Sequence, residues 1–207
     1  MSRYLIEVKK IKKNFNHKNG LVEIFKNVSL GVKAGDLVAL VGPSGSGKST
    51  FLHLLSFLDK PTSGQILFLG KDSKNFNEDE KDEIRRRKIS IIFQDNNLLS
   101  DFTTMENVIM PLMIRGEDYK SSLIKAKNVL KDVHLSERKN HFPNELSGGE
   151  QQRVAIARAL IAGSKLILAD EPTGNLDFKT SIEVFNYFLK LKKMNKTILF
   201  ATHNREL

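Results

Sequence analysis

The sequence predicts an α/β fold with a mostly parallel sheet, and two observations indicate it. Short apolar runs typical of strands alternate with helical segments along most of the chain. Residues 37–41 form an unbroken apolar run, as expected of a strand buried on both faces, and residues 166–169 form a second buried strand. The 207 residues are enough for one large domain with a subdomain.

Before residue 98 the pattern predicts strands separated by two helices. The strand at 37–41 leads directly into a glycine loop, and the first helix follows this loop. The second has a capping box in which Asn77 precedes Glu80 by three residues, and its order of acidic then basic residues suits the helix dipole. The expected elements are antiparallel strands at 5–8 and 28–32, the strand at 37–41, a helix at about 48–58, a strand at 65–69, the capped helix, and a strand at 89–93.

From about residue 98 to residue 141 the pattern is helical, which predicts an inserted helical subdomain. Helices are expected at 105–115, which Pro111 should kink or shorten, and at 121–133. After it follow the helix that carries residues 154–160, the strand at 166–169, a helix at 179–194 and a strand at 197–201. Large apolar side chains of the subdomain could form a groove for a partner's helix or the subdomain's own core. They are Leu98, Leu99, Phe102, Met105, Met110, Leu112 and Met113.

Charge and composition narrow the possible classes of protein. The net charge of +9 is compatible with nucleic acid, an anionic membrane surface or a polyphosphate ligand, but the scattered lysines favour an ordinary solvated surface. No apolar run approaches the roughly 20 residues of a membrane span, and residues 1–13 lack the apolar stretch of a signal peptide. The absence of cysteine excludes disulfides and thiolate metal sites, and is compatible with a reducing cytoplasm.

A glycine-rich loop between a buried strand and a helix has the P-loop pattern, which predicts a P-loop NTPase. The glycines let the backbone wrap around phosphates, Lys48 should reach the β- and γ-phosphates, and Ser49 should place its hydroxyl on Mg²⁺. The strand-to-helix context disfavours the alternative of a surface turn built from small residues. The predicted ATP-binding residues of this loop are Gly42, Pro43, Ser44, Gly45, Ser46, Gly47, Lys48, Ser49 and Thr50.

A second glycine loop opens a helix about a hundred residues later, at Leu146-Ser147-Gly148-Gly149-Glu150-Gln151. Free N–H groups and the positive end of the helix make such a loop an anion site. One nucleotide does not need two such loops from one subunit. The sequence therefore predicts a dimer of two copies of this chain, with ATP sandwiched between the P-loop of one and the second loop of the other.

Polar residues follow three of the apolar strands. Asp170 and Glu171 are adjacent acids, which are costly at the end of a buried strand unless something uses their charge. Asp170 is expected to support Mg²⁺, and Glu171 to act as general base or to orient the attacking water. Gln94 could contact the Mg²⁺ or that water, and His203 would face the crevice that holds the phosphates. The alternatives are a strand-end turn for the acids, a polar strand end for Gln94 and a structural role for His203.

Together these motifs resemble the ATP-binding subunit of an ABC transporter over essentially the whole chain. They follow the family's order: the P-loop, Gln94 as Q-loop, the Ser147 loop as signature, the two acids, residues 174–177 as D-loop and His203 as switch histidine. The resemblance implies a single nucleotide-binding domain with a RecA-like core, an antiparallel β subdomain and an α-helical subdomain. Residues 1–97 and 163–207 would form the core with the β subdomain, and residues from about 98 to 162 the helical subdomain and signature helix.

The resemblance also implies roles for individual residues. Ser147, Gly148 and Gly149 would hold the γ-phosphate of the ATP bound to the other subunit, Asp177 would cross the dimer interface, and His203 would contact the γ-phosphate. Phe15 stands where the family usually has a tyrosine stacked on adenine; a phenylalanine still offers an aromatic face. The alternative for Phe15 is a core position among the N-terminal strands.

Within the family the chain is most similar to the ATPases of bacterial lipoprotein-releasing transporters, on the strength of residues 94 and 98–116. Residues 171–177 are shared with macrolide-export and cell-division ATPases, so a drug or peptide exporter or a cell-division complex is the alternative. The similarity implies a homodimer of ATPase subunits that hydrolyses two ATP, integral membrane permease subunits as partners, and a location at the cytoplasmic face of the inner membrane. Nucleic acid is not expected, because ABC ATPases of DNA repair insert a long coiled coil between the P-loop and the signature, and no sustained heptads occur here.

The sequence departs from the family pattern at three places. Asp95-Asn96-Asn97 is not the sequence expected after the Q-loop, and Gln151 stands where arginine is common. The chain ends four residues after His203, where the family usually continues with a further strand or helix. Either the chain is shortened there or the C-terminal cap is absent.

Overall fold

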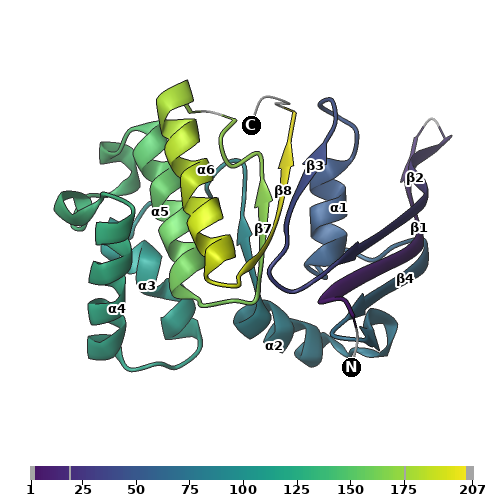
Figure 1. Ribbon diagram of the computed structural model, residues 1–207, viewed down its shortest axis with the longest axis horizontal. Coiled ribbons are helices and arrows are strands. Elements are labelled where there is room, and N and C mark those ends of the chain that lie inside the picture. The colour runs from purple at the N-terminus through teal and green to yellow at the C-terminus, as the bar shows by residue number, and fades with distance from the viewer. Residues whose placement is uncertain (1–2, 19, 175, 204–207) are drawn as a thin grey trace.

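The computed structural model describes all residues except 1–2, 19, 175 and 204–207. The described strands form two four-stranded sheets, an antiparallel one in the order β2-β1-β4-β5 and a parallel one in the order β3-β8-β7-β6 (Figure 1). This confirms the predicted α/β class. The strands are β1 Ile6–His17, β2 Gly20–Val32, β3 Leu37–Val41, β4 Ser63–Phe68, β5 Lys71–Asp72, β6 Ile89–Ile92, β7 Leu166–Asp170 and β8 Thr197–Thr202.

The helices cover the two faces of the parallel sheet unequally. One helix, α1, lies between the two sheets, whereas α3, α4, α5 and α6 gather on the opposite side of the parallel sheet (Figure 1). Three of these, α3, α4 and α5, come from the segment 98–162 and contact one another. The helices are α1 Lys48–Leu55, α2 Glu78–Lys88, α3 Thr104–Ile114, α4 Tyr119–Asp132, α5 Gly148–Ile161 and α6 Phe178–Lys193.

The central strands of the parallel sheet are buried on both faces because neighbouring residues face different cores. In β7, Leu166 and Leu168 pack in the core that contains α1 and the antiparallel sheet. Ile167 and Ala169 pack in the core that contains α3 to α6. Every residue of β7 and of β8 is buried. Two-sided burial removes the need for a polar face, which explains the apolar run at 166–169.

The strand β3 is less buried than its sequence predicts. It lies at an edge of the parallel sheet, pairs only with β8 among the described strands, and leaves Val41 51% exposed. The prediction that residues 37–41 are buried on both faces is therefore wrong. An apolar run favours a buried strand, but it carries no information on how many strands flank that strand or on what covers its faces.

Three elements, α1, β1 and β2, differ most in length from the predictions. The helix α1 ends at Leu55 rather than near residue 58, because Phe57 has a left-handed φ of 60° that cannot continue a helix. The strands β1 and β2 are longer than predicted, since irregular register along β1, with a φ of 49° at Lys10, breaks the alternation that a sequence pattern detects.

The starts of the helices follow their local signals. The Asn77 capping box of α2 is confirmed: the Asn77 side chain accepts from the Glu80 N–H at 2.8 Å, and the Glu80 carboxylate accepts from the Asn77 N–H at 2.9 Å.

Pro111 does not shorten α3, which continues to Ile114. Burial of Val108 and Leu112 on the same helix offsets the backbone bond that the proline removes.

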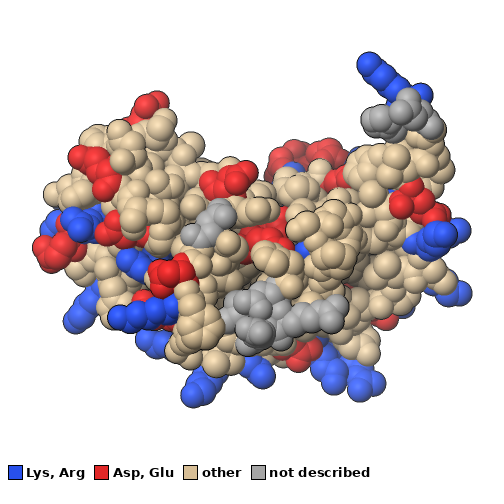
Figure 2. Space-filling model, turned by 90° about the horizontal axis from the view of Figure 1, so that it is seen from above, with Lys and Arg blue, Asp and Glu red and all other residues tan. Residues whose placement is uncertain are grey.

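The described residues contain no helix that is both long and apolar enough to span a membrane. Basic side chains surround the face at which the strands β7 and β8 end. Figure 2, which views this face, shows most of its visible Lys and Arg side chains along the margin.

Candidate nucleotide-binding site

The parallel register brings four polar segments of the sequence to one edge of the sheet. The last residues of β3 pair with those of β8, those of β7 also pair with β8, and those of β6 pair with β7. Because the four strands point the same way, the residues that follow them emerge together at their carboxyl ends (Figure 1). These residues are Gly42, Gln94, Glu171 and His203.

The P-loop reaches α1 through backbone conformations that favour glycine. Gly45 and Gly47 have φ values of 78° and 89°. A Cβ at Gly47 would lie 2.5 Å from the Ile24 side chain, so the loop also needs glycine to fit against β2. Gly47 is the N-cap of α1, and no side chain caps the helix there. The first N–H groups of α1 therefore have no side-chain acceptor, and they suit an anionic ligand.

Lys48 folds back over the loop and joins it to Glu171. Its Nζ lies 2.9 Å from the Gly42 carbonyl oxygen, 3.1 Å from that of Pro43 and 3.3 Å from Glu171 Oε1. The side chains of Lys48 and Glu171 are each only 10% exposed. A positive charge is thus held at the start of α1, where the P-loop pattern places the phosphates.

Glu171 lies at the centre of the cluster and has an uncommon backbone. Its φ is 45°, and its N–H donates to the Ala201 carbonyl at 3.1 Å, which fixes the turn after β7 to β8. Its Oε2 lies 2.8 Å from His203 Nδ1, while Oε1 contacts Lys48. The structure therefore brings Glu171, His203 and Lys48 into direct contact. Such a carboxylate has the geometry to accept a proton from a water molecule near the phosphates.

Asp170 tests whether the site fits Mg²⁺. It is buried, and its Oδ1 has no hydrogen-bond partner within the described part of the chain. A buried carboxylate oxygen without a partner is costly, and a cation would remove that cost. Ser49, in the first turn of α1, and Gln94, after β6, are exposed. No three His, Cys, Asp or Glu side chains among the described residues cluster as a metal site.

The signature loop is built differently from the P-loop. Ser147 caps α5 by accepting from the Glu150 N–H at 3.3 Å, and the Glu150 carboxylate accepts from the Ser147 N–H at 2.9 Å. Arg138 Nε lies 2.9 Å from Glu150 Oε1. The Ser147 N–H, followed by Arg138, lowers the pKa of Glu150. Gln151 donates to the carbonyls of Pro143 and Leu146, so it braces the loop where the family usually has arginine.

The two loops stand apart within one chain. The helix α5, which the signature loop opens, packs on the face of the parallel sheet opposite to α1 (Figure 1). No hydrogen bond in the described structure joins residues 42–50 to residues 146–151. A Cβ on Gly148 would meet no atom within 4 Å, so the surface of this loop is open.

Two further predicted residues lie at the surface. Phe15 is 43% exposed on β1, with Lys13 Nζ 4.5 Å from its ring centre, so the alternative of a core position is wrong. Asp177 caps α6: its carboxylate accepts from the Thr180 N–H at 3.0 Å and from the Thr180 hydroxyl at 2.6 Å, and these bonds lower its pKa. Asn175 of the predicted D-loop lies outside the described residues. Adenine stacking by Phe15 and an interface role for Asp177 stay predictions.

Sequence reasoning missed the contacts that hold the signature helix in place. Arg138 binds Glu150, and Arg158 of α5 donates to the backbone of residues 96 and 97. The only signal for Arg158 was a charged residue between Ala157 and Ala159 in an otherwise apolar stretch of helix. Such a residue needs a partner when its neighbours are buried.

Comparison with known families gives a match over most of the chain. A family model described as ABC transporter matches residues 25–174. Proteins named lipoprotein-releasing system ATP-binding protein LolD are similar over the whole chain. The protein from Rickettsia bellii is 45% identical and that from Legionella pneumophila (strain Paris) 46%, and each alignment covers 100% of this chain and 92% of the relative.

Solved structures of ABC cassettes have the same fold. The dimeric structure of MJ0796, described as a bacterial ABC transporter cassette, has a TM-score of 0.91 and 40% identity over 97% of this chain and 89% of that chain. A dimeric post-hydrolysis state of MJ0796 bound to ADP and Pi has a TM-score of 0.91 and 39% identity over the same shares of both chains. The structure of cbiO1 from Clostridium perfringens has a TM-score of 0.84 and 29% identity, over 98% of this chain and 80% of that chain.

Proposed function

The chain belongs to the ABC transporter family of ATP-binding proteins, and we propose that it is the ATPase that drives lipoprotein release from a bacterial inner membrane. Enzymatic ATP hydrolysis follows from that family. The observation that carries the proposal is the contact of Glu171 with both Lys48 and His203 at the carboxyl end of the parallel sheet. The named function of relatives that align over the whole chain supports lipoproteins as the cargo.

In the proposed mechanism the residues of this cluster have three roles: binding the phosphates, accepting a proton from water and holding Mg²⁺. The first N–H groups of α1 bind the phosphates, and Lys48 exchanges its contact with Glu171 for the β- and γ-phosphates. This exchange frees Glu171 Oε1 to accept a proton from the attacking water, while His203 Nδ1 holds Oε2. Ser49, Asp170 and Gln94 would hold Mg²⁺, which supplies positive charge against the phosphate oxygens.

We infer that the active form is a dimer. The open face of the Ser147 loop, its separation from the P-loop of its own chain and the dimeric state of the MJ0796 cassette support this inference. Ser147, Gly148 and Gly149 would close the ATP site of the partner copy. Each chain then supplies half of each site, and hydrolysis depends on association.

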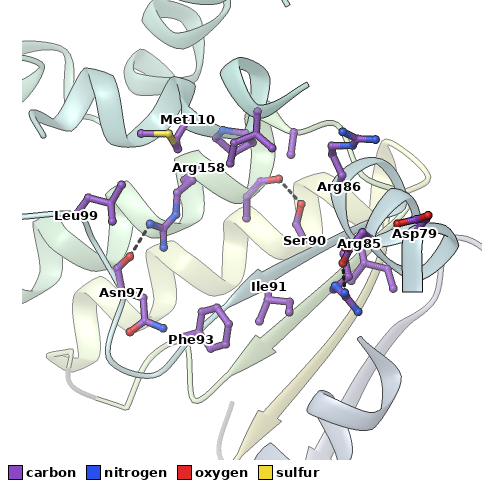
Figure 3. Close-up of a pocket in the computed structure, with 16 residues that line it drawn as sticks. Asp79, Arg85, Arg86, Ser90, Ile91, Phe93, Asn97, Leu99, Met110 and Arg158 are labelled. Atoms are coloured by element: carbon purple, nitrogen blue, oxygen red, sulfur yellow. Dashed lines mark hydrogen bonds and ion pairs between the residues drawn. The ribbon is translucent and has the colours of Figure 1, made fainter. Parts of the chain in front are cut away.

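A groove at the junction of α2, β6, α3 and α5 is the proposed docking site for a permease subunit. It has a volume of about 900 Å³. Leu99 and Met110 lie on its wall (Figure 3), and Ile114, also in the lining, is 63% exposed. Met105 and Leu112 are buried in the core instead, so the apolar side chains of the subdomain divide between core and groove. A partner at this groove would hold the ATPase at the cytoplasmic face of the membrane.

The variant Glu171→Gln tests the enzymatic part of the proposal. It should bind ATP, nearly abolish hydrolysis and accumulate as an ATP-bound dimer in size-exclusion chromatography. The wild-type protein with ATP is the control, since it should return to the monomer after turnover. Full hydrolysis by a monomer, independent of protein concentration, would contradict the dimeric mechanism.

The cargo requires a test in cells. Expression of Glu171→Gln should retain lipoproteins in the inner membrane, as measured by membrane fractionation. Pull-down of the full chain from detergent-solubilised membranes should recover a polytopic subunit. Normal lipoprotein sorting combined with increased drug sensitivity would replace the proposed cargo with that of an exporter, and recovery of DNA alone would exclude a transporter.

A further inference from the structure

The chain reverses direction tightly just after Gln94, in the segment that departs from the family pattern. Asn96 and Asn97 both have left-handed backbones, with φ values of 59° and 46°. Asparagine tolerates this conformation better than most residues. The turn is closed by the Asn96 N–H, which donates to the Phe93 carbonyl at 3.2 Å, and by the Asn97 N–H, which donates to the Asp95 carbonyl at 2.6 Å.

Arg158 of α5 binds this turn through both terminal nitrogens of its guanidinium group. Its Nη1 donates to the Asn97 carbonyl at 2.7 Å and its Nη2 to the Asn96 carbonyl at 2.6 Å, and Figure 3 shows Arg158 directed at Asn97. The described residues offer Arg158 no carboxylate within ion-pair distance. The planar fork of an arginine holds two carbonyl oxygens in one fixed geometry through two different nitrogens, whereas a lysine has a single ammonium group on a flexible stem.

The environment of Arg158 indicates that this pairing is required. Burial lowers the pKa of Arg158, and its neighbours Ala157 and Ala159 are buried. A desolvated guanidinium is costly unless it is hydrogen-bonded, so α5 and the turn are bound to each other. The turn begins next to Gln94, and α5 begins at the signature loop.

We propose that Arg158 is a positioning residue that fixes Gln94 relative to the signature helix. The inference rests on the proposed ATPase function, in which Gln94 acts at the metal. Both Asn97 and Arg158 also line the groove proposed for the permease, so an occupant of the groove would contact this link directly. A misplacement of about 1 Å in such a group can cost on the order of 100-fold in rate.

Arg115 provides a matched control for Arg158. Its Nε donates to the Arg86 carbonyl at 2.7 Å and its Nη1 to the Ala162 carbonyl at 2.6 Å, and burial lowers its pKa as well. Arg115 thus also binds two backbone carbonyls, but one belongs to α2 and the other to the residue that caps the end of α5, and neither belongs to the turn after Gln94. The variants Arg158→Gln and Arg115→Gln therefore remove similar bonds and differ in their link to Gln94.

The test combines steady-state ATP hydrolysis with hydrogen exchange of the nucleotide-free full chain. Arg158→Gln should lower kcat by roughly 10- to 100-fold with little change in the KM for ATP. Its peptide covering residues 94–98 should exchange faster than in the wild type. Arg115→Gln should leave both quantities near their wild-type values. Arg158→Lys, which keeps the charge but loses the planar fork, should give intermediate values and keeps the test valid if Arg158→Gln does not fold.

Two results would overturn the role of Arg158. One is a kcat of the Arg158 variants equal to that of Arg115→Gln, and the other is unchanged exchange at residues 94–98. A wild-type chain without ATPase activity would instead refute the proposed function. The exchange measurement needs no ATP, so it still decides whether Arg158 holds the turn.

Discussion

The P-loop and the signature loop both contain glycines and open a helix, yet the backbone N–H groups at the two helix starts are satisfied in different ways. No side chain caps α1, so its first N–H groups have no side-chain acceptor, and Lys48 reaches back over the loop. The helix α5 is capped by Ser147 and Glu150, and Arg138 holds that carboxylate. Both loops are rich in glycine, but only the helix start at the P-loop lacks a side-chain cap.

The difference supports the proposed roles, in which the P-loop binds the nucleotide of its own chain and the signature loop contacts the nucleotide of the partner copy. The P-loop leaves the helix end and its lysine to be completed by phosphates, whereas the signature loop is complete as a fold element and presents an open surface at Gly148. A preformed loop of this kind can bind a charged group that arrives on another chain without first rearranging. The proposed dimer would therefore use the P-loop for binding within a subunit and the signature loop for assembly.

The largest expected effect comes from breaking one loop in each of two chains. Lys48→Ala and Ser147→Arg should each lower ATP hydrolysis by roughly 100-fold. Lys48→Ala removes the positive charge that would bind the phosphates, and Ser147→Arg blocks the ATP site of the partner. A mixture of the two should recover activity, since a mixed dimer contains one site with an intact P-loop and an intact signature. The measurement is hydrolysis against mixing ratio.

Nucleotide binding supplies the control for the mixing experiment. Ser147→Arg should still bind a fluorescent ATP analogue through its own P-loop. If this variant lost binding as a monomer, or if the mixture stayed inactive, the signature loop would not act across the dimer.

Replacing one glycine in each loop by alanine should have smaller effects, which should differ between the two loops. Gly47→Ala places a Cβ 2.5 Å from Ile24 at a φ of 89°, which should cost about 1–3 kcal/mol of stability and weaken nucleotide binding. Gly148→Ala meets open space and improves helix propensity, so it should not destabilise the monomer. It should impair only ATP-dependent dimerisation. Denaturant unfolding and sizing with ATP measure the two effects, and a destabilised Gly148→Ala would contradict the open surface.

Removal of the signature cap should have a modest effect on the free protein. Ser147→Ala removes the acceptor for the Glu150 N–H and should cost about 1 kcal/mol. For a domain of this size that lowers Tm by about 2–4 °C. Ser49→Ala at the other loop is the matched control, and it should stay within about 0.5 kcal/mol because Ser49 caps no helix. Thermal unfolding without nucleotide compares the two variants. Equal losses of stability would contradict the claim that a side chain caps the helix at the signature loop but not at the P-loop.

The smallest expected effect is the pH dependence of stability that Glu150 of the signature loop provides. The Ser147 N–H and Arg138 lower the pKa of Glu150 below its unfolded value near 4.5. Their contribution to the free energy of unfolding is full above that pH and disappears as the pH falls through the lowered pKa. Glu150→Gln should therefore lose less stability than the wild type between about pH 4.5 and pH 3. If the stability of Glu150→Gln and of the wild type fell identically with pH, the Glu150 carboxylate would not form these hydrogen bonds in solution.

Local patterns predicted the elements and the chemistry that depends on neighbours in sequence. The Asn77 capping box and the buried strand β7 follow from such patterns, because each depends on residues within a few positions. Non-local features were missed. The edge position of β3 depends on which strands pair with it, and the length of β1 depends on irregular register that periodicity cannot show.

By itself the sequence determined the family, the α/β class and the residue types at the nucleotide site, because glycine spacing and strand-end acids are local in sequence. Only the tertiary structure decided which of these residues meet. The contacts of Glu171 with Lys48 and His203, and of Arg158 with Asn96, join segments far apart in the chain. The physical reason is that such distances depend on strand register and on how two hydrophobic cores pack against one sheet, and packing of distant segments leaves no periodic mark in the sequence.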